Sequence, residues 1–183
     1  MKRFIAKLRT FHDDERGSLA VETVIIIPVL FWAYLSMFAI FDSYRQHSIN
    51  QKAAYTIGDI ISRETTPLDT AYMNGTRDVL AYLTANTEGN VAVRVTSVKY
   101  DAENGVYKRD WSQAKGWRPA RGDADVSELK TLLPVMPHNE HVMVVETFVK
   151  YDPPFATGLQ NREIQNFVFT RPRYAPRVLW SDG

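Results

Sequence analysis

The sequence of 183 residues contains no cysteine. Disulfide bonds, thiolate metal ligands and a cysteine nucleophile are therefore excluded, and the redox compartment cannot be inferred from thiols. The chain also lacks an excess of one charge, since 22 basic and 21 acidic residues leave a formal net charge of +1. These totals give no indication of the strongly basic surface that is typical of nucleic-acid binding.

Charged side chains are missing altogether from residues 24–41. At a rise of about 1.5 Å per residue, a helix of this length spans roughly the hydrocarbon thickness of a bilayer. A lone spanning segment must be helical, because it has to satisfy its backbone hydrogen bonds internally. Pro28 lies near the start of the segment, where a membrane helix tolerates it. The pattern predicts a transmembrane helix followed by a soluble body.

Charges flanking this segment indicate its direction. The segment is followed by fewer charges, of both signs, at Asp42, Arg45 and Lys52. The basic residues that precede it are Lys2, Arg3, Lys7, Arg9 and Arg16. This bias predicts a cytoplasmic N-terminus and a domain on the other side of the membrane.

Removal by ordinary signal peptidase is disfavoured. That enzyme needs small residues at the first and third positions before the cut. A cut after Ala39 would put Met37 at the third position, and a cut after Ser36 would put Tyr34 there.

Glu22 stands just before the apolar segment, and a carboxylate in a membrane helix costs up to about 2.5 to 3.5 kcal/mol at the bilayer centre and less near the interface. One interpretation places it at the headgroup level, ionised and hydrated. The other follows from the string Arg-Gly-Ser-Leu-Ala-Val-Glu at 16–22, which resembles a type IV prepilin cleavage site. In that family a basic leader ends in glycine, a membrane aspartyl peptidase cuts after it, and glutamate is the fifth mature residue. The resemblance implies that Gly17 ends the leader, Ser18 becomes the N-terminus and Glu22 is that glutamate.

A glutamate and a proline with five residues between them, as in Glu22 and Pro28, resemble the TadE/TadF group of pseudopilins of the tight adherence (Tad, or Flp) type IVb pilus system. An aromatic residue commonly follows the glutamate in that group, and Thr23 stands there in this chain. The resemblance implies a minor pilin in the bacterial inner membrane, with a periplasmic C-terminal domain and incorporation in the pilus as an open alternative. The implied partners are prepilin peptidase, other minor pilins, the major Flp pilin, the inner-membrane assembly platform and the lipid bilayer.

The chemistry of such a site is charge pairing between subunits. Cleavage creates an ammonium group on Ser18, and Glu22 of a neighbouring subunit can pair with it where the helices bundle. An unpaired buried carboxylate is costly, so the pairing favours one axial register over others. Within one chain, Ser18 and Glu22 stand one helical turn apart and can also pair.

Helical spacing continues beyond the membrane segment. Apolar residues recur at Ile49, Ala53, Ile57, Ile60 and Ile61, which predicts an extension of the helix ending near the Thr-Thr-Pro of 65–67. A second helix is predicted over 68–85, with Tyr72, Val79, Leu80 and Leu83 in phase and an interruption possible at Asn74 and Gly75.

Strands are predicted after residue 86. Val91, Val93 and Val95 alternate with Ala92, Arg94 and Thr96, as in a half-buried strand. A turn at 101–105 and a partner strand at 107–111 follow, then a long loop over 112–137 with one helical turn near 126–132, and strands at 141–151 and 164–170. The predicted fold is α+β and pilin-like: leader 1–17, transmembrane helix 18–41, helical continuation 42–66 and an extracytoplasmic domain 67–183 with an antiparallel sheet.

The sequence contains no phosphate-binding glycine loop, nucleophile elbow or similarly specific catalytic motif, and no cofactor is predicted. His138 and His141 lack the zincin spacing and an evident third ligand, and are interpreted as surface residues. The tripeptide at 121–123 is interpreted as a chance match. Basic residues Arg171, Arg173 and Arg177, with Tyr174 and Trp180 between and after them, are interpreted as a solvated tail that docks on its own domain rather than as a nucleic-acid site.

The sequence therefore favours a non-enzymatic assembly protein. The alternative is an unprocessed single-pass membrane protein whose periplasmic domain binds a ligand or scaffolds a complex. A membrane-tethered hydrolase would need a convergent acid, base or nucleophile, and the sequence gives no candidate for one.

Overall fold

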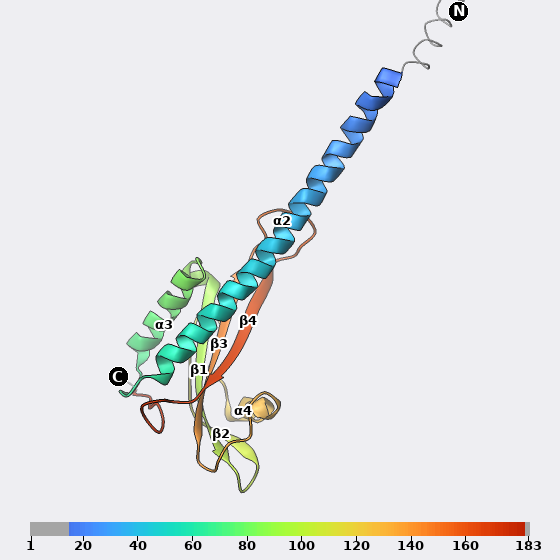
Figure 1. Cartoon of the computed structure of the whole chain (residues 1–183). Helices are drawn as coiled ribbons and strands as arrows, with labels where there is room; N and C mark the ends of the chain where they lie inside the picture. Colours follow the sequence, from blue (N-terminus) through green and yellow to red (C-terminus); the bar gives the residue numbers. More distant parts are fainter. Residues whose placement is uncertain (1–14, 182–183) are drawn as a thin grey trace, which may run out of the picture. The chain divides into compact units, whose positions relative to one another are not determined.

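The computed structural model describes residues 15–181 (Figure 1). These residues form two compact units. One consists of residues 15–42 together with the segment Pro153–Gln160, and the other contains Ser43–Asp152 and residues 161–181. The long helix α2, Glu15–Ser62, begins in the first unit and ends in the second, which we call the folded domain.

The folded domain is α+β, as predicted. Its elements after α2 are α3 (Thr70–Leu83), η1 (Glu88–Asn90), β1 (Val91–Asp101), β2 (Val106–Lys115), α4 (Asp123–Ser127), η2 (Glu128–Thr131), β3 (His141–Tyr151) and β4 (Arg162–Thr170). The strands described here form one antiparallel sheet in the order β2-β1-β3-β4. β1 and β3 therefore occupy its centre.

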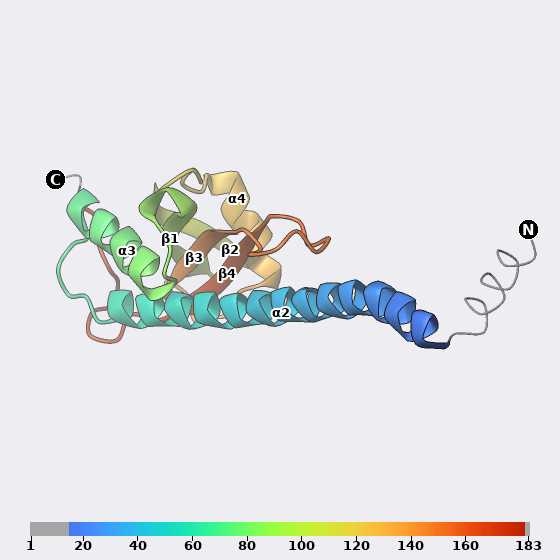
Figure 2. The same cartoon turned by 90° about the horizontal axis from the view of Figure 1, so that it is seen from above.

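Helices α2 and α3 cover one face of the sheet (Figure 2). Ala53, Ile57 and Ile61 of α2 are buried, which confirms most of the predicted apolar stripe, but Ile60 is 41% exposed. In α3 the predicted phase is half right: Leu80 is buried and Tyr72 packs partly buried against the core, whereas Val79 and Leu83 are exposed. Residues that face the core from α3 are Met73, Thr76, Leu80 and Ala81.

Capping hydrogen bonds are found at the start of α3 and at the end of α2. The Asp69 carboxylate accepts a hydrogen bond of 2.7 Å from the Tyr72 amide, so α3 begins later than predicted. The helix passes through Gly75 without interruption. α2 ends at Ser62, short of the predicted 65–67, and the Ser62 carbonyl accepts a hydrogen bond of 2.7 Å from the Arg173 amide. The C-terminal tail thus satisfies a carbonyl that a longer helix would have used internally.

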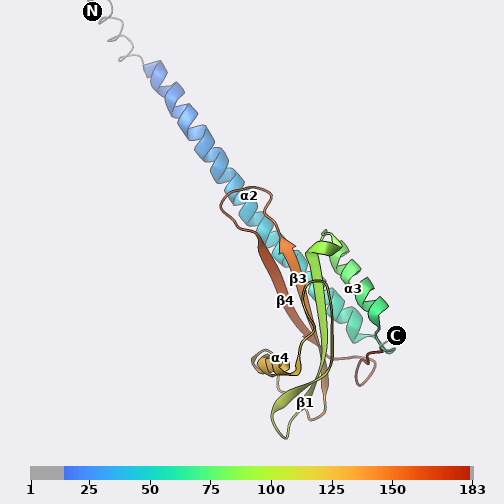
Figure 3. The same cartoon turned by 180° about the vertical axis from the view of Figure 1, so that it is seen from behind.

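Segment 116–136 covers the opposite face of the sheet, where α4 lies (Figure 3). Val126, Leu129 and Met136 pack there against Val98 and Val144 of the central strands. The predicted helical turn near 126–132 corresponds to the end of α4 and η2. The prediction of loop from residue 112 is wrong, because β2 continues to Lys115.

Gly116 allows the chain to leave β2 and cross the sheet. Its φ is +114°, and a Cβ atom there would lie 2.5 Å from the Cβ of Ala92. Such a close approach is possible only for glycine. Because this covering segment buries Ala92 and Thr96, β1 is buried on both faces, and the prediction of a half-buried strand is wrong.

Candidate functional site

The predicted processing site lies at the beginning of α2. Gly17 and Ser18 belong to the helix backbone, as does Arg16, while Lys2, Arg3, Lys7 and Arg9 lie outside the described residues. The Glu22 side chain, one helical turn beyond Ser18, is exposed. The arrangement presents a carboxylate on a helix surface where a neighbouring chain could reach it.

Apolar side chains cover the next turns of α2. Val24 is 71% exposed, Phe31 61% and Phe41 65%. Exposed apolar surface of this extent is unfavourable in water. Within the described residues, one helical stretch, Ala20–Ser62, is long and apolar enough to cross a membrane by length and composition. Pro28 lies within it and removes one amide donor, so that the carbonyl four residues earlier loses its helical partner.

A second constellation, which sequence analysis missed, is a buried ionic cluster in the folded domain. The Glu146 side chain on β3 is fully buried, and the Arg94 and Arg121 side chains are only 12% and 13% exposed. Arg94 on β1 donates to both carboxylate oxygens, from Nε at 2.6 Å and from Nη2 at 2.8 Å. Arg121 does the same from Nε at 2.8 Å and from Nη2 at 2.7 Å.

Two bidentate guanidinium contacts determine the charge state of Glu146. Burial alone would raise the pKa of this carboxyl, but hydrogen bonds from Arg121 and Arg94, and their positive charges, lower it below its usual range. The remaining Nη1 atoms of Arg94 and Arg121 donate to the carbonyls of Pro119 and Asp125. The cluster therefore fastens segment 116–136 to the central strands.

Further contacts hold the same segment. The Trp117 indole donates 2.9 Å to Glu163 on β4, and the Lys150 ammonium lies 4.4 Å from the Trp117 ring centroid. Arg118 also pairs with Glu163 and lies over the Phe148 ring. We interpret the whole arrangement as structural.

One signal in the sequence could have indicated the cluster. Glu146 is the single acidic residue within the apolar strand 142–149, and a charge at a position predicted to be buried requires a partner. The alternation of β1 places its partner Arg94 on the exposed face, and nothing in the tripeptide at 121–123 singles out Arg121. Neither partner could be chosen without the strand register.

The interpretation of His141 as a surface residue is wrong. Its side chain is 11% exposed, and burial lowers its pKa although Asp110, 3.7 Å away, acts in the opposite direction. His138 is more exposed, at 42%, and its Nδ1 accepts a hydrogen bond of 3.2 Å from the Ala102 amide.

The C-terminal tail docks on its own domain, as predicted. Arg171 pairs with Glu140 at 2.6 Å and Arg173 with Asp59 at 3.0 Å. Trp180 packs against Trp111, whose indole donates 2.9 Å to the carbonyl of Val178. The basic residues are thus engaged with acidic groups of the same domain.

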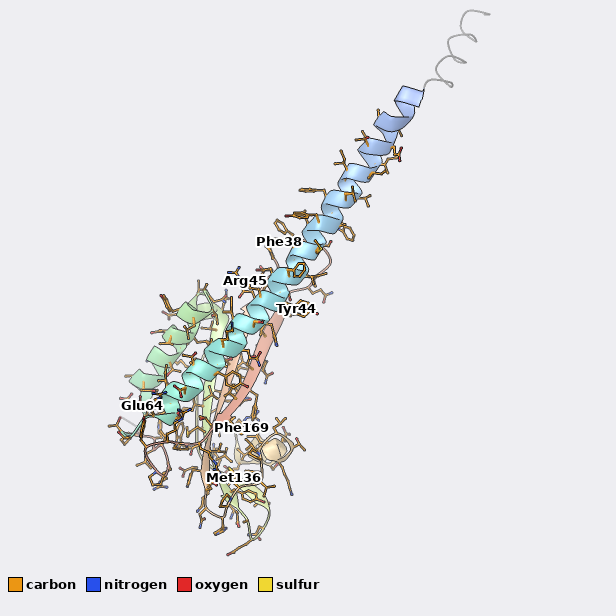
Figure 4. The ribbon with its side chains drawn as sticks, viewed as in Figure 1. Phe38, Tyr44, Arg45, Glu64, Met136 and Phe169 are labelled. Atoms are coloured by element: carbon orange, nitrogen blue, oxygen red, sulfur yellow. The ribbon has the colours of Figure 1, made fainter. Side chains whose placement is uncertain are left out.

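A shallow apolar groove of about 260 Å³ lies between α2 and α3. Exposed Ile60 and Val79 lie on its walls. At one side the Tyr72 hydroxyl donates 3.1 Å to Glu64 Oε1, and burial together with this carboxylate raises the pKa of Tyr72. Figure 4 labels Glu64, which marks the end of the groove near the α2 terminus.

These features define a class: a protein with one N-terminal helix long and apolar enough to span a membrane, joined to a small domain with a four-stranded antiparallel sheet. Comparison of the chain with protein-family models, with curated proteins and with solved structures gives no match.

Proposed function

We propose that this protein is a TadE/TadF-like minor pseudopilin that is required for assembly of a Tad (Flp) type IVb pilus. Prepilin peptidase cuts between Gly17 and Ser18 and removes the basic leader. The apolar part of α2 then holds the protein in the bacterial inner membrane, with the folded domain in the periplasm. Its partners are other minor pilins, the major Flp pilin and the membrane assembly platform.

The observation that carries the proposal is the spacing of Gly17, Ser18 and Glu22 at the head of an exposed apolar helix. A carboxylate in hydrocarbon is costly unless it finds a partner. The new ammonium group at Ser18 of an adjacent subunit supplies that partner in one register and not in others. The role is structural, and catalysis is not part of it.

Replacement of Glu22 tests this role. In cells, Glu22→Ala is expected to leave membrane insertion intact and to lower surface pilus yield on the order of tenfold or more, since a buried ion pair is lost. The matched control is Val21→Ala, which trims the exposed neighbouring side chain and keeps the carboxylate. Normal pilus yield from inserted Glu22→Ala protein would contradict the proposal.

The apolar groove between α2 and α3 favours a second candidate, an unprocessed single-pass protein whose periplasmic domain binds or scaffolds a partner. That protein would keep Met1 and tolerate replacement of Gly17. The pseudopilin, in contrast, would lose Met1 with its leader and would not be processed after replacement of Gly17.

A further inference from the structure

The β3–β4 connection is associated with the apolar part of α2. Segment Pro153–Gln160 belongs to the same compact unit as residues 15–42. The Phe155 ring meets the Phe38 ring edge to face, with centroids 5.8 Å apart. Figure 4 labels Phe38 on α2. Both side chains keep much of their surface open, since Phe38 is 48% and Phe155 40% exposed.

The composition of this connection is unusual for a surface loop. Segment 153–160 reads Pro-Pro-Phe-Ala-Thr-Gly-Leu-Gln and carries no charged side chain. Charges stand on either side of it, at Asp152 and Arg162. An aqueous loop has no need to exclude charge, whereas a segment at the boundary of headgroups and acyl chains does.

The base of the loop is fixed at the end of the apolar stretch. Arg162 donates a hydrogen bond to the Ser43 hydroxyl, and its guanidinium lies 5.8 Å from the Tyr151 ring centroid. Ser43 follows directly after Asp42, the first charged residue beyond the uncharged stretch 24–41. The loop therefore starts where the helix is expected to leave the hydrocarbon.

The position of Phe38 along α2 indicates how deep in the membrane the loop lies. It precedes Phe41, the last residue of the uncharged stretch, by three positions, or about 4.5 Å along a helix. An aromatic ring beside Phe38 then lies at the level where aromatic residues are enriched in membrane proteins. Tyr44 and Arg45, which follow on α2, are residue types found at such boundaries.

We propose that the loop Pro153–Gln160 is a second membrane-contact element, which inserts Phe155 into the outer headgroup–acyl boundary of the bilayer that α2 spans. The occupant of its exposed apolar surface is lipid. This contact rests on the membrane placement of α2 in the proposed function.

The absence of cysteine allows the contact to be measured with single reporters. Ala156→Cys is placed in the full chain, labelled with bimane and reconstituted at one chain per nanodisc, so that a second copy cannot cover the loop. Lipids with a nitroxide near the carbonyl end of the acyl chain, or near its terminal methyl, report depth. Iodide reports access from water.

The shallow nitroxide is expected to quench the Ala156 reporter several-fold more than the same label at Tyr82→Cys, an exposed aromatic position of α3. At the Ala156 reporter, the deep nitroxide is expected to quench less than the shallow one. Iodide is expected to quench this reporter least of the three. Lipid quenching no stronger than at the Tyr82 reference would overturn the proposal.

A second reporter separates this inference from the proposed anchor. Phe41→Cys on α2 is expected to be quenched by lipid because the helix spans the bilayer. Quenching at Phe41 but not at Ala156 would refute the loop contact alone. Absence of quenching at both positions would refute the membrane placement of α2 and the loop contact together.

The role of Phe155 itself is tested by adding Phe155→Asp to the Ala156 reporter. A carboxylate resists entry to the boundary, so lipid quenching is expected to fall several-fold. The matched control is Phe169→Asp, at a phenylalanine of similar exposure, 43%, on β4. It is expected to leave quenching unchanged, and equal quenching in both variants would overturn the role of Phe155.

Discussion

Arg94 and Glu146 face each other directly across the central β1–β3 ladder, and the guanidinium of Arg94 binds both oxygens of the Glu146 carboxylate. Arg121, from the segment that covers this face, binds the same two oxygens. One buried carboxylate thus joins two strands and a connecting segment, and its removal leaves two guanidinium groups without their anion.

Glu146→Gln is expected to lower the free energy of unfolding of the folded domain by about 3 to 5 kcal/mol, because an amide cannot neutralise two mostly buried cations. Urea unfolding of the full chain in detergent micelles, followed by tryptophan fluorescence, measures this change. The matched control is Glu88→Gln, since Glu88 pairs with Arg77 but is 61% exposed. The control is expected to change stability by about 1 kcal/mol or less, and equal losses in the two variants would contradict the account.

The same carboxylate sets the response to acid. Because the folded state lowers the pKa of Glu146, the stability that its charge contributes is fully present above the ordinary Glu pKa of about 4.3. That contribution is lost as the pH falls through the lowered folded-state pKa. Unfolding free energies measured downward from pH 6 are expected to fall less steeply below about pH 4.3 in Glu146→Gln than in the wild type. If the unfolding free energy fell equally steeply with pH in the variant and in the wild type, the lowered pKa of Glu146 would be contradicted.

Docking of the C-terminal tail predicts that substitutions at the neighbouring residues Val178 and Leu179 differ in their effect on stability. Val178 is 1% exposed within the α2/α3 core, whereas Leu179 is 42% exposed. Val178→Ala is expected to cost about 1.5 to 3 kcal/mol, and Leu179→Ala about 0.5 kcal/mol or less. Thermal or urea unfolding of both variants measures the difference. A tail that does not dock would make the two substitutions equivalent.

Replacement of Gly75 and of Gly116 by alanine is expected to change the stability of the domain in opposite directions. Gly75→Ala, in the interior of α3 with open space around it, is expected to stabilise the domain by about 0.5 to 1 kcal/mol. Gly116→Ala is expected to destabilise it by about 1 kcal/mol or more, because the new Cβ meets the Ala92 backbone at 2.8 Å in a left-handed conformation. Chemical denaturation of each variant distinguishes these effects. A loss of stability in Gly75→Ala, or none in Gly116→Ala, would contradict the described backbone.

Local patterns in the sequence were sufficient for the type and position of most elements. Valine-rich composition and the Asp-Pro-Pro that follows predicted β3 at 141–151 with its observed bounds, and helical spacing predicted most of the buried stripe of α2. Both signals are local, because they lie within the segment itself or directly beside it. The uncharged apolar run, which is also a local signal, predicted a helix of membrane-spanning length.

Features that depend on long-range contacts could not be predicted in this way. The alternation of β1 indicated one wet face, but a segment from beyond Gly116 covers that face and buries Thr96. At the end of α2, the Ser62 carbonyl bonds to the Arg173 amide, more than a hundred residues later. The ionic cluster joins Arg94, Arg121 and Glu146 across a register that no local pattern encodes.

The assignment of Gly17, Ser18 and Glu22 remains a prediction from the sequence. The structure places Gly17 and Ser18 in α2 and leaves Glu22 exposed, which is compatible with processing and with pairing to a neighbour. Processing is the step from which the other parts of the proposed function follow.

The most direct test is therefore the N-terminal residue and intact mass of the protein, purified from membranes of cells with and without prepilin peptidase. Our account predicts a chain beginning at Ser18 in the first cells and at Met1 in the second. A chain that begins at Met1 in both would contradict the pseudopilin assignment.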